Sequence, residues 1–385
     1  MIAPGIQLPA AAPGVEHLAN KVKAGLPRSR VDAGTSAFAG AGKSGMTAPG
    51  YGNRQRSGRP LFSCRLFRAP TVKAFSHPTE TRAPMIDCLI VGGGPAGLTA
   101  AIYLARFHLE VLVVDGGNSR AMLIPKTRNH AGFPEGITGP NLLRRMNQQA
   151  RIYGAQIVEG QVDALAREHE AFRVTGSFGA VTARTVLLAT GVINNRPDMP
   201  DALHDEALSR GLLRYCPICD AYEVTDLPVG VIGTGGHGMR EATFLRGYTA
   251  DLTLIAPEET HDLAQEERAA LVEAGVRIVD GPATGFEIGA DRIRVECAAG
   301  ALSFASIYPA LGSAIRSELG VAMGAETSAE GCLLVDAHQR TSVPGLYAAG
   351  DVVKGLDQIS HAMGEGGVAA TTIRNDLAEK RPLRR

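Results

Sequence analysis

Two cysteines in the middle of the chain carry the most direct chemical signal. Cys216 and Cys219 are separated by two residues in the run CPICD, and Asp220 follows them. A C-x-x-C pair can close a small redox-active disulfide, in which one thiol is commonly made more acidic. Asp220 can accept or supply the proton that dithiol–disulfide exchange must move. The pattern predicts a catalytic site made of these three residues.

Half of a zinc site is the alternative explanation of this spacing. A zinc centre needs a second pair of ligands, whereas Cys64, Cys88, Cys297 and Cys332 each stand alone in the sequence. None of the ten histidines forms a matching pair nearby. The sequence therefore favours redox chemistry, and we expect no metal site.

A glycine-rich turn upstream of the cysteines predicts a dinucleotide-binding site. Its spacing is G-x-G-x-x-G. Gly92 permits the turn, Gly94 lets the backbone approach a pyrophosphate at a helix amino end, and Gly97 lets helix and strand pack closely. An apolar strand at 86–91 precedes the turn and a helical stretch at 98–107 follows it, which is the setting that the motif requires.

Asp115 adds to this prediction. It ends the next apolar strand, 111–115, where an acid can bind a ribose hydroxyl. With Pro95 and Ala96, which complete the turn, these residues form the first expected cofactor site.

The pattern recurs after the cysteines. The second copy consists of a strand at 229–232, a turn with Gly233, Gly235 and Gly238, a helix at about 239–247 and a strand at 251–255. Two such units predict two nucleotide-binding domains, most economically with a flavin in one and a nicotinamide in the other. The alternative is that the second turn is only a structural corner between strand and helix.

Composition bounds the class of protein. The 385 residues suggest two or three domains, and the 39 basic side chains balance the 39 acidic ones. This balance argues against a nucleic-acid or membrane-surface role driven by bulk charge. No apolar run reaches the ~18–20 residues of a membrane-spanning helix. Six cysteines are too few for a disulfide scaffold, so we expect a cytoplasmic protein.

Residues 1–84 differ from the rest of the chain. They contain 12 Lys and Arg against three acids, are rich in Gly, Pro, Ala and Ser, and show no sustained apolar period. Such a stretch buries too little apolar area to offset its chain entropy. We expect it to be disordered, or to be an over-extended start upstream of Met85.

The motifs, taken in this order, resemble those of the low-molecular-weight thioredoxin reductases. The resemblance covers essentially all of 85–385. It rests on these segments: GGGPAG (92–97), NHAGFPEGITG (129–139), ATG (189–191), CPIC (216–219), GTGGHG (233–238), GLYAAGD (345–351) and QISHAMGEG (358–366).

The resemblance implies an α/β fold of two Rossmann-like, three-layer β/β/α nucleotide-binding domains, the second inserted into the first. Residues 85–195 and 313–385 would form the FAD-binding domain, and 196–312 the NAD(P)-binding domain that carries the redox disulfide. The sequence agrees, because a strand at 185–188 closes before the insertion and flavin-type motifs return only after Gly312.

The same resemblance assigns residues to the flavin. Asp351 is expected at the ribityl chain or phosphate region, and Asn129 near the flavin. The other implied flavin contacts belong to the matching segments and are Ala189, Gly191, Gly350, Gln358 and Ile359.

The resemblance also implies the reaction. Cys219 would face the flavin, Cys216 would attack the partner's disulfide, and Asp220 would be the acid–base group of a thioredoxin-disulfide reductase. Electrons would pass from NAD(P)H through FAD and the disulfide to a thioredoxin-like protein or a small disulfide. Relatives are homodimers in which one domain rotates against the other, and we expect both properties here.

The second nucleotide unit departs from the family pattern. NADPH-dependent members place basic residues after its second strand, whereas here Glu258 and Glu259 follow and no Lys or Arg appears until Arg268. Two carboxylates would repel a 2′-phosphate. Ala256 also stands where Asp115 stands in the first unit, although Glu258 could serve instead. NADPH, NADH and no nicotinamide at all therefore stay open.

The residues after the disulfide, 221–223, differ from the aromatic stretch of ordinary thioredoxin reductases. They are closer to flavin-dependent dithiol oxidases, which pass electrons from a dithiol to oxygen, and this is the alternative function. The intact Cys216, Cys219 and Asp220 argue against a non-catalytic FAD-binding or redox-sensing protein.

Overall fold

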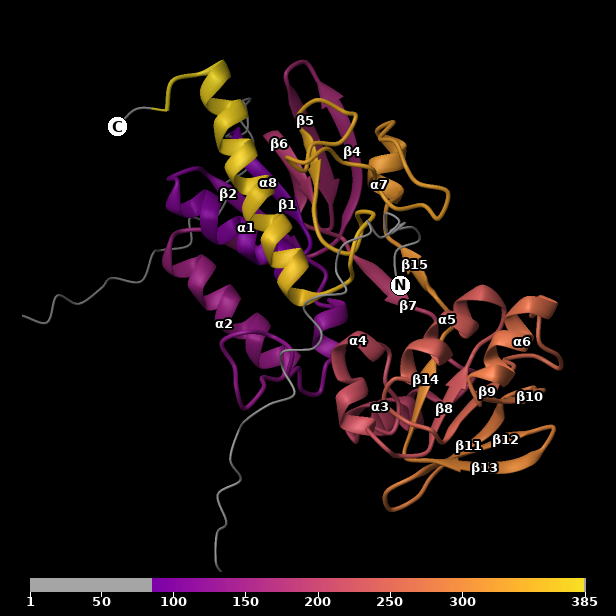
Figure 1. Ribbon diagram of the computed structural model, residues 1–385. Coiled ribbons are helices and arrows are strands. Elements are labelled where there is room, and N and C mark those ends of the chain that lie inside the picture. The colour runs from indigo at the N-terminus through magenta and orange to yellow at the C-terminus, as the bar shows by residue number, and fades with distance from the viewer. Residues whose placement is uncertain (1–84, 384–385) are drawn as a thin grey trace, which may run out of the picture. The chain divides into compact units, whose positions relative to one another are not determined.

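The computed structural model describes residues 85–383, so the expectation for 1–84 lies outside the described residues. Two sheets, one mixed and one parallel, carry the helices that position the site (Figure 1). The chain completes most of the first sheet, builds the second, and then returns to the first.

The first sheet has the order β3-β2-β1-β6-β5-β4, with β16 also paired to β6. Its parallel strands are β1 (Ile86–Val91), β2 (Val111–Asp115), β3 (Gln156–Glu159), β6 (Gly179–Leu188) and β16 (Leu346–Ala348). The antiparallel strands β4 (Val162–Glu168) and β5 (Ala171–Gly176) extend it along the first part of β6. Its helical segments are α1 (Pro95–Arg106), η1 (Arg120–Leu123), α2 (Gly139–Ile152), α7 (Glu318–Ala322) and α8 (Ile359–Lys380).

The second sheet is parallel throughout, in the order β10-β9-β8-β14. Its strands are β8 (Val229–Ile232), β9 (Leu252–Ile255), β10 (Arg277–Val279) and β14 (Ser306–Pro309). The helical segments around it are α3 (Asp201–Ser209), α4 (Pro217–Asp220), η2 (Ala221–Val224), α5 (Gly235–Leu245) and α6 (Gln265–Glu273).

Two smaller antiparallel groups complete the fold. The strands β11 (Thr284–Ile288), β12 (Ile293–Cys297) and β13 (Gly300–Phe304) form a meander, and β7 (Val192–Asn194) pairs with β15 (Ser313–Ile315). This last pair lies where the chain leaves the first sheet and returns to it. The fold is therefore the expected α/β arrangement of two Rossmann-like units, the second inserted into the first.

Several elements differ from the sequence expectation at their ends. The helix after the first glycine turn begins at Pro95 rather than residue 98, because the fixed φ of proline suits the first helical turn. In the second unit the helix begins at Gly235 rather than residue 239. β6 extends back to Gly179 because its first half pairs with the preceding strand β5 in a hairpin, and this half is more exposed than the apolar run at 185–188.

The close packing of α1 against α8 determines how these two helices lie in the first unit. The two helices pack against each other, and a Cβ on Gly366 would lie 2.3 Å from the carbonyl oxygen of Ala96. A Cβ on Gly97 would lie 2.0 Å from the carbonyl oxygen of Gly92. Both glycines are therefore required by close backbone approach. Within the described part of the chain, no helix combines the length and apolar character needed to cross a bilayer.

We expect Gly366→Ala to destabilise the protein by about 1–3 kcal/mol, because the added methyl forces α8 away from α1. Gly364→Ala in the same helix is the matched control, since a Cβ there meets nothing within 4 Å. The control should be stabilising by roughly 0.5–1 kcal/mol. Thermal unfolding of both variants measures the difference, and equal shifts of the two midpoints would contradict the packing argument.

Candidate active site

The structure joins Cys216 and Cys219 in a disulfide. Cys216 lies directly before α4, and Pro217 is the first residue of that helix. The carbonyl oxygen of Cys216 accepts hydrogen bonds from the backbone N–H groups of Cys219 and Asp220. This turn holds both sulfurs on one side of a short helix. Among residues 85–383, no cluster of three or more His, Cys, Asp or Glu side chains could hold a metal ion.

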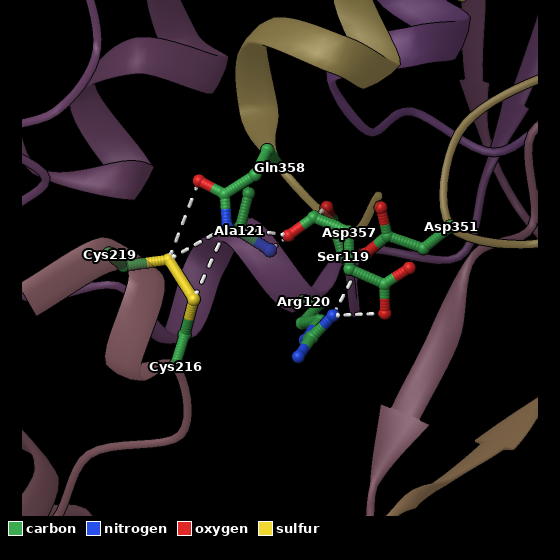
Figure 2. Close-up of polar contacts among 8 residues, drawn as sticks. All are labelled: Ser119, Arg120, Ala121, Cys216, Cys219, Asp351, Asp357 and Gln358. Carbon is green, nitrogen blue, oxygen red and sulfur yellow. Dashed lines mark hydrogen bonds and ion pairs between the residues drawn. A yellow bond between two sulfur atoms is a disulfide. The ribbon is translucent and has the colours of Figure 1, made fainter. Parts of the chain in front are cut away.

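Gln358 connects the disulfide to the first sheet's helices. Its side-chain Nε2 lies 3.3 Å from the Sγ atoms of both Cys216 and Cys219 and donates to them (Figure 2). Its Oε1 accepts a hydrogen bond from Asn129 Nδ2 at 3.0 Å. Because Gln358 directly precedes α8, the position of that helix sets the position of the amide. The structure thus brings together four residues that the sequence predicted.

Asp220 lies in a buried network with two residues that the sequence did not identify. Its Oδ2 accepts from Arg214 Nη1 at 2.9 Å, and its Oδ1 accepts from the Tyr308 hydroxyl at 3.0 Å. Burial raises the pKa of Asp220, and the Arg214 cation opposes this rise. Burial and the nearby Asp220 carboxylate raise the pKa of Tyr308 as well. Arg214 therefore limits the cost of keeping a carboxylate in this position.

A second charged group lies on the opposite side of Gln358. Arg120, in η1, donates from Nη1 to Asp351 at 3.1 Å and to Asp357 at 2.9 Å (Figure 2). Burial, followed by the Asp351 charge, raises the pKa of Asp357, while Arg120 lowers it. The sequence predicted Asp351 alone. Arg120 had no motif to mark it, whereas Asp357 could have been noticed from its place beside Gln358.

A cavity of about 880 Å³ is lined by the disulfide and by nearly all the expected flavin residues. The predicted residues on its wall are Gly92, Gly94, Pro95, Ala96, Asp115, Asn129, Ala189, Gly191, Cys216, Cys219, Asp220, Gly350, Asp351, Gln358 and Ile359. Gly97 is not on this wall, because it faces the backbone of Gly92.

The cavity wall fits a dinucleotide. Gly92 has a φ of +113°, and a Cβ there would lie 2.3 Å from the Ala189 carbonyl oxygen. Gly94 precedes α1 without a side-chain cap, so the amino end of this helix presents its N–H groups to an anion. A Cβ on Gly93 would overlap the carboxylate of Asp115, so this glycine allows Asp115 to lie beside the turn.

The second glycine turn lies away from this cavity. Gly233 and Gly238 contact each other, with a Cβ on Gly238 lying 2.8 Å from the Gly233 carbonyl carbon, and Gly235 begins α5 with a φ of +57°. None of the three lines the cavity that holds the disulfide. The structure therefore separates the second expected nucleotide turn from the first.

Comparisons with known proteins agree with this arrangement. The family model described as pyridine nucleotide-disulphide oxidoreductase matches residues 86–366. A thioredoxin reductase of Mycolicibacterium smegmatis is 33% identical over 78% of this chain and 99% of its own length. The crystal structure of HlmI is 31% identical with a TM-score of 0.71, over 77% of this chain and 93% of its own. The thioredoxin reductase of Streptococcus pyogenes is 26% identical with a TM-score of 0.69, over 77% of this chain and 100% of its own.

A disulfide on the wall of a dinucleotide cavity, with a second nucleotide-type unit inserted in the first, defines a disulfide oxidoreductase of the flavoenzyme class. The chain belongs to the pyridine nucleotide-disulphide oxidoreductase family, within its low-molecular-weight thioredoxin reductase-like group. Its cofactors are FAD and a nicotinamide nucleotide. The relatives favour the reductase over the dithiol oxidase that residues 221–223 suggested.

We expect Arg120→Met to destabilise the protein by about 3 kcal/mol at pH 8, because two buried carboxylates lose their cation. The loss should be smaller at pH 5. Without Arg120 the pKa of Asp357 rises further, and a carboxyl whose pKa is raised by folding adds stability as the pH falls through that value. Thermal unfolding at both pH values measures this, with exposed Arg292→Met as the control. A pH-independent loss would contradict the electrostatic account.

Proposed function

We propose that this enzyme passes electrons from a nicotinamide nucleotide, through FAD and the Cys216–Cys219 disulfide, to the disulfide of a thioredoxin-type protein. The observation that carries the proposal is that Gln358 holds both sulfurs at the wall of the dinucleotide cavity. The names of the relatives, which are thioredoxin reductases, support the choice of partner.

The proposed cofactor sites follow the two units. FAD would be held by residues of 85–195 and 313–385, with its pyrophosphate at the amino end of α1 and Asp115 on its ribose. The insertion, 196–312, would hold the nicotinamide nucleotide at its own glycine turn. When bound, FAD would supply two-electron transfer from the nucleotide, which gives up a hydride, to the Cys216–Cys219 disulfide, which becomes a dithiol. The proposed flavin contacts are Gly92, Gly94, Pro95, Ala96, Gly97, Asp115, Asn129, Ala189, Gly191, Gly350, Asp351, Gln358 and Ile359.

The cysteines would perform the exchange with the partner. The thiolate of Cys216 attacks one sulfur of the partner's disulfide, which breaks that bond and releases a partner thiolate. Cys219 then attacks Cys216 in the mixed disulfide, which restores the Cys216–Cys219 bond and releases the second partner thiol. Cys216 suits the first role because it also lines a small second pocket, next to Pro217 and Leu356, that Cys219 does not line.

Two side chains would assist these steps. The Gln358 amide donates to both sulfurs in the disulfide state, and the same N–H groups can stabilise a thiolate after reduction. Asp220 would supply the proton to the departing thiolate, because it directly follows Cys219 and burial raises the pKa of its carboxyl group. Arg214 would position Asp220 and limit this rise.

We also propose that the protein is a homodimer. As its interface we propose a patch of exposed apolar residues that lie on or directly after α1, α2 and α8, namely Tyr103, Phe107, Ile152, Tyr153 and Val368. The three helices lie side by side in Figure 1, and α1 packs on both of the others. A patch of this kind fits a second copy of the same chain, which would cover its aromatic rings.

We propose a cytoplasmic location, which is supported by the cysteines outside the redox pair within residues 85–383. Cys88, Cys297 and Cys332 are free thiols, which a reducing compartment preserves. Cell fractionation tests this location, and recovery from a membrane or secreted fraction would reject it.

We expect Cys216→Ser and Cys219→Ser each to lower nucleotide-dependent reduction of a thioredoxin disulfide by at least roughly 10³-fold, because the exchange needs both sulfurs. Asp220→Asn should lower it by roughly 10²-fold. Cys297→Ser is the control and should keep full turnover. If Cys219→Ser retains full turnover, the disulfide route is wrong. A different pair of results would indicate the dithiol oxidase: neither NADH nor NADPH reduces the enzyme, and the enzyme oxidises a small dithiol in the presence of oxygen.

We expect Ile152→Asp to lower the mass measured by light scattering from twice 40.3 kDa towards the monomer value, because a buried carboxylate would oppose association. Val272→Asp, on an exposed residue of α6, is the matched control and should leave the mass unchanged. A wild-type protein with the monomer mass would reject the homodimer.

A further inference from the structure

The second nucleotide unit has the β-α-β arrangement in which adenosine specificity is normally decided. β8 and β9 are parallel neighbours, and α5 connects them after the glycine turn. In such units the residues just past the second strand contact the adenosine ribose: an acid accepts from the 2′-hydroxyl of NAD, whereas an arginine accommodates the 2′-phosphate of NADP. For this chain, those residues are the ones that follow β9.

The residues after β9 are acidic. Ala256 is fully buried and continues the ladder by donating from its backbone N–H to Val279, so the chain is first exposed around Glu258 and Glu259. The next cation along the chain, Arg268, comes only after α6 has begun. A 2′-phosphate placed here would meet carboxylates rather than a guanidinium, so this site does not fit NADPH.

The segment that contains these acids, residues 257–262, folds back over the amino end of α5. The backbone N–H of Asp262 donates to the Thr234 hydroxyl at 2.7 Å, and a Cβ on Gly235 would lie 3.3 Å from the Asp262 carbonyl oxygen. Thr234 directly precedes α5. This contact keeps the acidic segment beside the glycine turn instead of extending it into solvent.

Two opposite charges lie over the first turn of α5. A Cβ on Gly236 would be 3.0 Å from Arg240 Nη1 and 3.0 Å from Glu267 Oε1. Glu267 is held there because its Oε2 accepts from the backbone N–H of Ala264 at 3.0 Å. Arg240 and the α5 amino end can together bind one pyrophosphate, and the Glu267 carboxylate beside them offsets part of the Arg240 charge. A second phosphate group on the ribose would approach the exposed Glu258 and Glu259 carboxylates, and the cation nearest along the chain is Arg268 of α6, whose charge acts on His261.

We propose that this enzyme is selective for NADH over NADPH, with the Glu258 carboxylate accepting from the adenosine 2′-hydroxyl and with Glu258 and Glu259 repelling a 2′-phosphate. This inference rests on the proposed function, because it specifies the nicotinamide donor of that reaction. The two added charges of the 2′-phosphate decide the selectivity, since the rest of the two nucleotides is identical.

Equilibrium binding to the FAD-loaded enzyme tests the proposal without relying on turnover. Calorimetric titration should give a dissociation constant for NAD⁺ at least roughly 30-fold lower than that for NADP⁺, because the carboxylates repel the added phosphate. Glu258→Arg combined with Glu259→Arg should reverse or abolish this preference. Glu273→Arg, a charge reversal at the far end of α6, is the matched control and should keep it. Matching unfolding temperatures of the variants would exclude a folding defect as the cause.

The outcomes separate this inference from the proposed function. Tighter binding of NADP⁺, or a double variant that keeps the wild-type preference, would overturn NADH selectivity and leave the disulfide reaction intact. If neither nucleotide binds while dithiothreitol reduces the flavin anaerobically, both the selectivity and the nucleotide-dependent reaction fail. If NAD⁺ binds as expected but Cys219→Ser keeps full disulfide turnover, the proposed disulfide route fails and the selectivity stands.

Discussion

The contact between the Gln358 amide and the two sulfurs connects the chemistry of this protein to its packing. Gln358 directly precedes α8, and α8 is placed by its close approach to α1 at Gly366 and Ala96. The amino end of α1 in turn forms part of the wall of the dinucleotide cavity. One helix crossing therefore sets both the shape of the cofactor cavity and the position of the amide that contacts the disulfide. A change of a few tenths of an ångström at this crossing is transmitted to both, because neither helix has free space at the contact.

The charges around the disulfide are arranged in two compensated groups. Asp220 has Arg214 and Tyr308, while Asp351 and Asp357 share Arg120. In both groups burial raises the pKa of a carboxyl group, and an arginine restrains the rise. The two groups have different consequences, however. Asp220 adjoins Cys219 in the sequence and is suited to proton transfer, whereas Arg120 neutralises two carboxylates that would otherwise repel each other and any phosphate in the same cavity.

The two strand–turn–helix units share their glycine pattern but differ in the residues at the end of the second strand. Both have a strand, a tight turn and a helix, and in both the third glycine packs against the first. In the first unit the second strand ends in Asp115, close enough to the turn that Gly93 has no room for a side chain. In the second unit the corresponding strand ends at Ile255 and is followed by buried Ala256, and the exposed acids come next in a segment held to Thr234. The selectivity that we propose for the second site thus depends on a loop contact rather than on the glycine motif.

Local rules determined much of this protein from its sequence alone. Strand, glycine turn and helix follow one another within a few residues, so β1, β2 and β8 were predicted with their observed bounds, and C-x-x-C spacing was enough to place the redox pair. Family motifs added Asn129, Asp351 and Gln358, and the structure places these residues at the same cavity. What only the tertiary structure decided is the set of partners: Arg120 for Asp357, Tyr308 for Asp220, and the Gln358 amide for both sulfurs. The physical reason is that each pair joins residues far apart in the chain, with no local period or spacing to mark them. Only the packing of the helices and sheets brings such groups within hydrogen-bond distance.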